Sequence, residues 1–442
     1  MRSDLFRLTV RSSRRPAAVA IALIVAAGCS SSSTRTTAPS TTSVAATATS
    51  SSTASVTSSA PTGPPSTTAS PAPTTVVPST TVVPPTTLSP AQLAADYSKP
   101  GPFPVGVTKL ALPAGNEVVV WYPAVPGTTG TFTYDVRDYN SPAIKALLTA
   151  DIPATFSIDA GLDAAVADGR HPLALYSHGF SGIDVGSSFL TATLASYGVV
   201  VAAPDHPSRD LASATSGKVG DQTSAVTDLL ATVTLLHDQD ATSGGRFSGH
   251  VDTAKVVAIG HSAGGGTVLS AAADPSISAY VSLASGALGQ RSTDGSSTTV
   301  APPPMPAKPS LFIAGKVDTV VPWETVTKPA YDAAPSPSAL WVIDGVGHNG
   351  FDDFCTFGNG KGIIGIAEAS GLGPFLDTNP QFRKLGQDGC IPPAVPVEQA
   401  WPIIRHAVTA FALQQFGNRG ATADLQPSLA GAFGLPVTIQ QK

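Results

Sequence analysis

Three side chains that are far apart in the sequence could together form a nucleophile, a base and an acid. Ser262 lies in the middle of the pentapeptide GHSAG at positions 260–264, and Asp318 and His348 follow it along the chain. A serine hydroxyl is a weak nucleophile until a neighbouring imidazole accepts its proton, and the imidazole needs a carboxylate to orient it. These residue types therefore predict attack by Ser262 on an acyl carbonyl carbon, with His348 as the base and Asp318 as the acid.

The sequence around Ser262 is typical of a tight turn between a strand and a helix. An apolar run, Val256–Ile259, precedes the pentapeptide, and a helical stretch, Ala263–Ala273, follows it. A serine on so sharp a turn leaves no space for flanking side chains, which explains glycine at both outer positions. The amides that open the helix would face the negative charge that develops during the reaction. The alternative interpretation is a chance glycine-rich turn, because glycine and serine are abundant in this chain.

Other carboxylates and one other histidine compete for the two remaining roles. Asp318 comes just past a predicted strand, on a loop that Pro322 ends before the next helix. Four further aspartates could replace it: Asp294, Asp344, Asp352 and Asp353. His406 is the only histidine after His348, and it falls in a predicted amphipathic helix, where packing or solvation is the expected role. We expect Asp318 and His348 to be the pair, and His261 to be structural.

The negatively charged oxygen of a tetrahedral intermediate needs hydrogen-bond donors. One predicted donor is the backbone N–H of Ala263, directly after the nucleophile. The other is the N–H of Phe180, in the run Ser177–Gly182 that follows the predicted strand Leu173–Tyr176. The Phe180 ring could also line a pocket for the acyl group. A simple turn at this run is the alternative interpretation.

Short apolar runs alternate with helical stretches, which predicts an α/β fold with a mostly parallel central sheet and helices on both faces. Functional groups in such sheets gather at the carboxyl ends of the strands, where the residues named above fall. An antiparallel pair, Val105–Leu112 and Glu117–Tyr122, is expected to open the sheet. The predicted buried strands are Leu173–Tyr176, Val199–Ala203, Val256–Ile259, Tyr280–Ala284, Leu311–Ala314 and Leu340–Ile343. The predicted helices are Ser187–Ser196, Gln222–His237, Ala263–Ala273, Trp323–Tyr331 and Val397–Phe416.

The first residues have the composition of an export signal. Several arginines precede an apolar stretch, Ala17–Ala27, which predicts a signal peptide over residues 1–28. Cys29 directly after Gly28 resembles the bacterial lipobox, although Ala26 stands where lipoproteins usually carry Leu or Val. This resemblance implies a lipidated Cys29 that tethers the protein to the outer face of the cell membrane. An ordinary cleaved signal and a secreted protein are the alternative.

The next region, residues 29–95, is rich in Ser, Thr and Pro, with Arg35 as its only charge and no aromatic residue. Such a stretch cannot bury enough apolar surface to offset the entropy of the chain, so we predict a disordered stalk before a catalytic domain at 96–442. A flexible leader with no task fits the sequence equally well. The two remaining cysteines, Cys355 and Cys390, predict a disulfide, since a lone pair in an exported protein is more often a disulfide than a metal site.

The overall composition excludes several other classes of protein. The chain has 442 residues, 25 Lys and Arg against 30 Asp and Glu, and a formal net charge of -5, which argues against nucleic-acid binding. No apolar run reaches the roughly 18–20 residues that span a bilayer, so a polytopic membrane protein is excluded. The histidines show no ligand spacing such as H-E-x-x-H, so no metal and no other cofactor is expected. Trp323, shortly after Asp318, is the tryptophan that we expect to form a pocket wall. The sequence carries no signal for an oligomeric state.

Several segments together resemble the platelet-activating-factor acetylhydrolases. They are SHGF at 177–180, Val199–Ala203 leading into Asp205-His206, GHSAGG at 260–265 and HNGFDDF at 348–354. The resemblance covers most of Pro102–Gly365, and it is also close to the bacterial polyesterase, lipase and cutinase group, which shares a late disulfide. It implies the α/β-hydrolase fold, a triad of Ser262, Asp318 and His348, and an oxyanion hole of the Phe180 and Ala263 amides. The stretches 135–170 and 355–390 match no single subgroup, and there we expect a lid or an acyl pocket.

The residues and the resemblance together predict a serine ester hydrolase whose partner is a small-molecule or lipid ester. The acetylhydrolase likeness favours lipid or short-acyl esters, and the polyesterase likeness favours polyesters. A non-catalytic cell-envelope binding protein on the same scaffold is the alternative from another class. A protein that had lost activity is expected to lack a triad residue or the oxyanion loop, which is the run Ser177–Gly182 that carries the Phe180 donor. This sequence lacks neither.

Overall fold

The structure is a computed structural model that describes residues 97–286, 304–418 and 424–442. The predicted signal peptide at 1–28, the lipidation site Cys29 and the stalk at 29–95 lie outside the described residues, as does the alternative acid Asp294. Among the helices of the described part, none is both long enough and apolar enough to cross a membrane.

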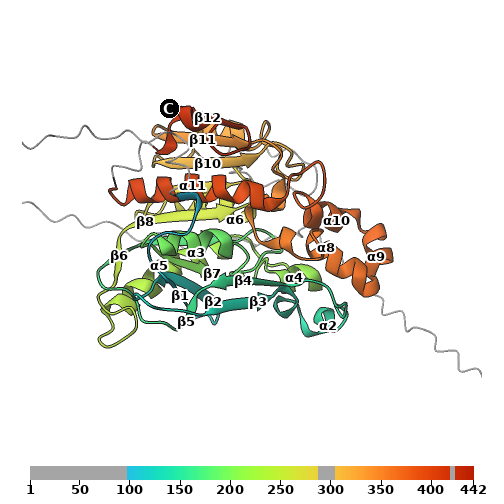
Figure 1. The fold of residues 1–442 in the computed structure, drawn as a ribbon, viewed down its shortest axis with the longest axis horizontal. Coiled ribbons are helices and arrows are strands. Elements are labelled where there is room, and N and C mark those ends of the chain that lie inside the picture. Colours follow the sequence, from blue (N-terminus) through green and yellow to red (C-terminus); the bar gives the residue numbers. More distant parts are fainter. Residues whose placement is uncertain (1–96, 287–303, 419–423) are drawn as a thin grey trace, which may run out of the picture. The chain divides into compact units, whose positions relative to one another are not determined.

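A ten-stranded sheet forms the centre of the fold (Figure 1), with the strand order β12-β11-β10-β9-β8-β6-β7-β2-β1-β5. The strands between β11 and β7 in this order pair in parallel, and antiparallel pairs flank them on both sides. This arrangement confirms the predicted α/β fold class. The bounds are β1 Val105–Ala111, β2 Glu117–Pro123, β5 Gly161–Leu162, β6 His171–Ser177, β7 Val200–Pro204, β8 Val251–His261, β9 Ile277–Leu283, β10 Ser310–Gly315, β11 Ser338–Ile343 and β12 Val437–Gln441.

Helices cover both faces of the sheet because the strands are apolar on both faces. In β2, Val119 and Trp121 belong to one buried hydrophobic cluster, whereas Val118 and Val120 belong to the other. Helices α3 and α11 pack in the first cluster, and α5, α6 and α7 pack in the second. These helices are α3 Ser188–Ser196, α5 Ser224–Ala241, α6 Ala263–Ala271, α7 Thr327–Ala333 and α11 Val397–Gln415.

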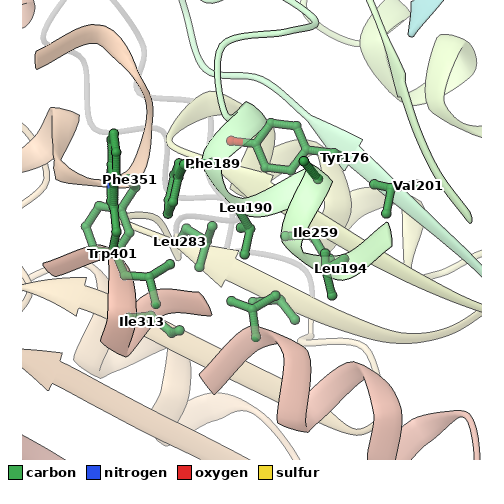
Figure 2. Packing of buried hydrophobic residues seen from close by; sticks show 14 of the residues in the cluster. Tyr176, Phe189, Leu190, Leu194, Val201, Ile259, Leu283, Ile313, Phe351 and Trp401 are labelled. Carbon is green, nitrogen blue, oxygen red and sulfur yellow. The ribbon is translucent and has the colours of Figure 1, made fainter. Parts of the chain in front are cut away.

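The first cluster also holds the segment that follows β11. Phe189 of α3 stacks on Trp401 of α11 with 4.6 Å between ring centroids, and Figure 2 shows both rings in one cluster with Phe351 and Ile313. Phe351 is fully buried, and it lies only three positions after His348. Core packing therefore anchors the short loop that carries the predicted base.

The stretches that matched no subgroup contain secondary structure of their own. Strands β3 Thr131–Asp135 and β4 Thr155–Asp159 form a separate two-stranded sheet. Helix α2 lies between these two strands in the sequence. Three short helices occupy the later stretch. Figure 1 places α2 and these three helices at the same end of the sheet. Their bounds are α2 Pro142–Lys145, α8 Gly362–Ala367, α9 Gly373–Thr378 and α10 Pro380–Gln387.

The expected elements are present with shifted ends, but one helix begins later than expected and several short elements were not predicted. The predicted helix Trp323–Tyr331 begins only at Thr327, because residues 323–326 form a turn in which the Val326 amide donates to the Pro322 carbonyl oxygen at 3.0 Å. Strand β12 was not predicted, since its short, partly exposed sequence has no strong apolar pattern, yet it pairs with β11. The short helix α4 Leu211–Ser216 was also not predicted.

Candidate active site

The nucleophile turn joins β8 to α6. Ser262 has φ 55° and ψ −120°, a backbone conformation that residues with a side chain rarely adopt. A Cβ atom on Gly260 would lie 2.2 Å from the Gly264 carbonyl oxygen, and one on Gly264 would lie 1.9 Å from the Ser177 carbonyl oxygen. Both glycines are therefore required by the close approach of neighbouring backbone, as the sequence pattern predicted.

The structure brings Ser262, His348 and Asp318 into one hydrogen-bonded chain. Ser262 Oγ lies 2.9 Å from His348 Nε2, and His348 Nδ1 lies 2.8 Å from Asp318 Oδ2. The other carboxylate oxygen, Asp318 Oδ1, accepts from the amides of Val320 at 2.9 Å and Val321 at 2.7 Å. Asp318 and His348 are both buried, so the imidazole has a fixed carboxylate on one side and the serine hydroxyl on the other.

Of the competing carboxylates within the described residues, Asp344 and Asp353 are engaged elsewhere, and Asp352 lies beside His261. Asp344 forms an ion pair with Lys316 at 2.9 Å. Asp353 accepts from the hydroxyl of Tyr134 at 2.9 Å and from the amides of Ser188 and Phe189 at the start of α3. Burial raises the pKa of Asp353 to about 8. Its contacts assign it to the packing of α3, away from the imidazole of the triad.

The remaining histidine candidates have structural contacts. His406 is buried inside α11, where its Nε2 lies 2.9 Å from the Asp424 carbonyl oxygen. His261 is also buried, and its Nε2 donates to the His348 carbonyl oxygen at 3.0 Å. Burial and the neighbouring His348 hold the pKa of His261 well below its ordinary value, so this imidazole is neutral. His261 therefore supports the backbone of His348, in agreement with the structural role predicted for it.

The loop that carries Phe180 lies against the nucleophile. A Cβ atom on Gly179 would be 3.1 Å from the Ser262 Cβ. Within the described residues the Phe180 amide has no backbone acceptor, whereas the next amide, that of Ser181, donates to the Arg209 carbonyl oxygen at 2.8 Å. The Ala263 amide opens α6 and so has no partner inside the helix. Both predicted donors thus lie close to Ser262, and their role as an oxyanion hole stays a prediction.

An arginine that the sequence patterns did not reveal holds this loop in place. Arg209 is almost fully buried, and burial lowers its pKa to about 10. Its guanidinium donates to the His178 carbonyl oxygen and to Ser177 Oγ, each at 2.8 Å, and to Thr267 Oγ1 at 2.7 Å. The only sequence signal is the neighbouring Asp205-His206 pair after β7, and that signal points to the segment rather than to Arg209.

A second serine, histidine and aspartate form a buried chain behind the same loop. Ser177 Oγ lies 2.9 Å from His206 Nε2, and His206 Nδ1 lies 3.1 Å from Asp228 Oδ2. Ser177 and His206 are fully buried, so no substrate could reach this serine. Burial holds the pKa of His206 well below its ordinary value. These three hydrogen-bonded residues therefore support the loop Ser177–Gly182, which carries Phe180, and do not form a second active site.

An apolar pocket of about 160 Å³ opens onto Ser262 and His348. Its walls come mainly from the two stretches in which a lid or an acyl pocket was expected, so these stretches do form a pocket at the predicted nucleophile. Residues between 136 and 148 form one wall, and residues between 363 and 386 form another. The large apolar side chains of these walls are Ile144, Leu147, Leu148, Ile363, Ile364, Ile366, Leu372, Phe375, Leu376, Phe382 and Leu385. Phe180 also lines the pocket, as expected.

The tryptophan expected at the pocket is elsewhere. Trp323 is not among the residues that line the pocket, and it packs instead against the hydrophobic cluster that contains α5, α6 and α7. The reason is the turn that precedes α7, which directs this segment to the opposite face of the sheet from α3 and α11. Closeness to Asp318 in sequence was therefore a poor guide to the location of this side chain.

One polar residue of the pocket has a strongly raised pKa. Asp352 lines the pocket next to His261, with 3.7 Å between Asp352 Oδ2 and His261 Nδ1. Burial, together with the nearby Asp353, raises the pKa of Asp352 well above its ordinary value. The shift favours the neutral carboxyl, the form that leaves the wall of the pocket without charge.

The predicted disulfide is present between Cys355 and Cys390. It closes the segment that contains α8, α9 and α10, and so ties both ends of one pocket wall together. Within the described residues no group of three or more His, Cys, Asp and Glu side chains is arranged to hold a metal ion.

The fold and this site define a serine ester hydrolase of the α/β-hydrolase class. Comparison with protein families agrees: residues 174–393 match the family model PETase, described as PET hydrolase-like. The matched segment begins within β6 and contains Ser262, Asp318 and His348. No curated protein matches the sequence. The match supports the polyesterase side of the resemblance seen in the sequence, and the likeness to the acetylhydrolases stays a prediction.

Proposed function

We propose that this protein hydrolyses apolar carboxylic esters, of lipid or short-acyl type, through an acyl-enzyme on Ser262. The observation that carries the proposal is the hydrogen-bonded chain of Ser262, His348 and Asp318 at the wall of an apolar pocket. A nucleophile, a base and an orienting acid within hydrogen-bonding reach are the requirement for acyl transfer by a serine.

In the acylation step the Ser262 hydroxyl gives its proton to His348 Nε2 while Oγ forms a bond to the ester carbonyl carbon. The carbonyl oxygen takes the electron pair of the broken π bond, and the amides of Phe180 and Ala263 donate to it. When the carbonyl re-forms, the bond to the alkoxide breaks, and His348 returns the proton to the leaving alcohol. Asp318 keeps the proton on Nδ1 and stabilises the imidazolium that forms in between.

Water then releases the acyl group by the same steps in reverse order. His348 takes a proton from water, whose oxygen forms a bond to the acyl carbon, and the same two amides stabilise the second oxyanion. The bond from the acyl carbon to Ser262 Oγ breaks, and His348 returns the proton to the serine. The products are a carboxylic acid and the regenerated enzyme, so the sequence of steps needs no cofactor.

The pocket supports an ester with an apolar chain. Its large aliphatic and aromatic side chains favour alkyl groups, since each buried methylene contributes about 0.8 kcal/mol. The raised pKa of Asp352, the one acidic residue among the described lining residues, favours an uncharged lining. A polyester is the second candidate, because the matched family is described as PET hydrolase-like. A pocket lined by two inserted segments suits the end of a monomeric chain better than the middle of a polymer, so we favour the lipid or short-acyl ester.

Export and anchoring are part of the same proposal. The signal peptide at 1–28, a lipidated Cys29 and a stalk at 29–95 would display the enzyme outside the cell, on the outer face of the membrane. Metabolic labelling with a fatty-acid analogue, compared between the wild type and Cys29→Ser, tests the anchor. Labelling that persists in the variant would contradict it.

A fluorophosphonate probe tests the proposed activity directly. Such a probe is expected to label the purified protein, and Ser262→Ala is expected to abolish the labelling. Hydrolysis of p-nitrophenyl esters of rising acyl length, beside a polyester film, then separates the two substrate classes. Absence of labelling in the folded wild type, or labelling that survives Ser262→Ala, would refute the assignment of the nucleophile.

A further inference from the structure

The acid and the base of the triad stand on two separate loops, and a third segment binds both loops. Asp318 follows β10 and His348 follows β11. Asp388, directly after α10, accepts from the His348 amide through Oδ1 at 2.7 Å. Its other oxygen, Oδ2, accepts from the amide of Thr319 at 2.9 Å and from the hydroxyl of the same residue. One carboxylate thus bridges the backbone of the base and the residue next to the acid.

We propose that Asp388 is a positioning residue that sets the distance between Asp318 and His348. The proposal rests on the proposed function, since it assigns to Asp388 the alignment of the same triad. Within the described residues the Asp388 carboxylate bonds to the loops of Thr319 and His348 and not to Ser262 or the imidazole ring, so its effect passes through the two loops.

The backbone around Asp388 packs closely against the loop of His348. A Cβ atom on Gly347 would lie 2.6 Å from both Asp388 Oδ1 and the Cα of Gly389. The Asn349 amide donates to the Asp388 carbonyl oxygen at 2.8 Å, and Asn349 Nδ2 donates to the Leu385 carbonyl oxygen at 2.7 Å. Because glycine is needed at 347 for this approach, the loop of the base fits against the Asp388 segment without intervening side chains.

The three donors that face Asp388 explain why a carboxylate is suited to this position. Hydrogen bonds to a charged acceptor are stronger than those between neutral groups. An ionised carboxylate offers two oxygens with several lone pairs, so it can accept from both loops at the same time. An asparagine at 388 could accept on one oxygen only and would hold one loop or the other.

The pocket wall has supports of its own that do not depend on this side chain. The Cys355–Cys390 disulfide closes the segment, and the Asn349 contact to Leu385 ties α10 to the same loop. Loss of the Asp388 carboxylate is therefore expected to misalign the triad more than it deforms the pocket. The signature of positioning is a fall in kcat at nearly constant KM.

The test compares Asp388→Ala and Asp388→Asn with the wild type. A matched control is Asp377→Asn, since Asp377 lies on the same inserted segment but is exposed and pairs with Arg383. We measure kcat, KM, the rate of fluorophosphonate labelling and the thermal midpoint of each protein. Small displacements of catalytic groups can cost about 10²-fold, so we expect roughly 10- to 100-fold lower kcat in Asp388→Ala, a smaller loss in Asp388→Asn and no change in Asp377→Asn.

A second pair of variants tests whether Thr319 and Asp388 act together. Thr319→Val alone is expected to lower kcat mildly, and it should lower kcat no further in the Asp388→Ala background, because residues that share one interaction are not additive. If Asp388→Ala does not fold, the same measurements on Asp388→Asn and Thr319→Val test the proposal.

The proposal is overturned if kcat of the folded variants stays near that of the wild type, if the loss lies in KM alone, or if it equals the loss of folded protein. These outcomes leave the proposed function intact as long as the wild type is labelled on Ser262. Failure of the wild type to react with the probe would instead refute the proposed function.

Discussion

The guanidinium of Arg209 lies 2.8 Å from the carbonyl oxygen of His178, while the carbonyl oxygen of Arg209 accepts from the amide of Ser181 at 2.8 Å. The two contacts hold the residues on either side of Gly179 and Phe180. The oxyanion loop is thus fixed from both ends by one buried side chain and its own backbone. Preorganised donors of this kind need no rearrangement when charge develops on the substrate.

Arg209→Lys is expected to weaken both catalysis and stability. A lysine ammonium lacks the planar fork that reaches His178, Ser177 and Thr267 together. Each buried group left without a partner costs about 1–3 kcal/mol, and one displaced oxyanion donor costs up to about 10²–10³-fold in kcat. Urea unfolding and ester hydrolysis measure the two effects, with the half-exposed Arg383→Lys as the control. Wild-type kcat in Arg209→Lys would contradict this role.

Asp318→Asn is expected to leave binding intact and to reduce turnover. An amide cannot stabilise the imidazolium, and it disturbs the tautomer in which Nδ1 carries the proton. The comparable change in serine proteases costs about 10⁴-fold in kcat, and we expect a loss of that order here with KM little changed. Asp344→Asn, on a carboxylate that pairs with Lys316, is the control. If Asp344→Asn caused the larger loss, the acid would be misassigned.

The neutral, buried His261 predicts a specific dependence of stability on pH. The pKa of His261 is lowered in the folded protein, so below the unfolded pKa of about 6.5 the unfolded chain binds a proton that the folded protein does not. The contribution of His261 is complete above that pH and is lost as pH falls, by at most about 1.4 kcal/mol per pH unit.

His261→Gln removes this titration and keeps a side-chain donor for the His348 carbonyl oxygen. The difference in the free energy of unfolding between the wild type and His261→Gln should therefore shrink from pH 7.5 to pH 5.5. Urea unfolding at several pH values measures it, and His237→Gln, on an exposed histidine, serves as the control. A difference that stays constant over this range would show that His261 titrates alike in both states.

Leu376 of α9 is suited to a test of chain-length selection because it is buried and lines the pocket. Leu376→Phe fills part of the pocket and should lower kcat/KM for long acyl esters relative to the acetate ester. A single methylene in an apolar site is worth about 1–3 kcal/mol, or 10- to 200-fold in selectivity. Parallel loss for all chain lengths would show that the acyl chain does not occupy this wall. The exposed Leu162→Ala on β5 is the control.

Local patterns predicted the parts of the site that depend on neighbouring residues in sequence. The glycines around Ser262 predict a tight turn. Asp318 and His348 each follow an apolar strand, so their location at one edge of a parallel sheet follows from the fold class. Trp323, by contrast, lies close to Asp318 in sequence, but it packs on the face of the sheet opposite α3 and α11. The direction of the Trp323 side chain depends on the turn before α7, and no periodic pattern of apolar residues indicates that turn.

By itself, the sequence determined the class of fold, the order of the reactive residues and the strand ends that carry them, because these depend on short-range patterns of apolar residues and glycines. Only the tertiary structure decided that residues from 136–148 and from 363–386 line one pocket. It also decided that Asp388 and Arg209 hold the loops of the site. Such contacts join segments that are far apart in the sequence, and no local pattern of residues predicts them. They depend on the packing of the whole core rather than on local propensity.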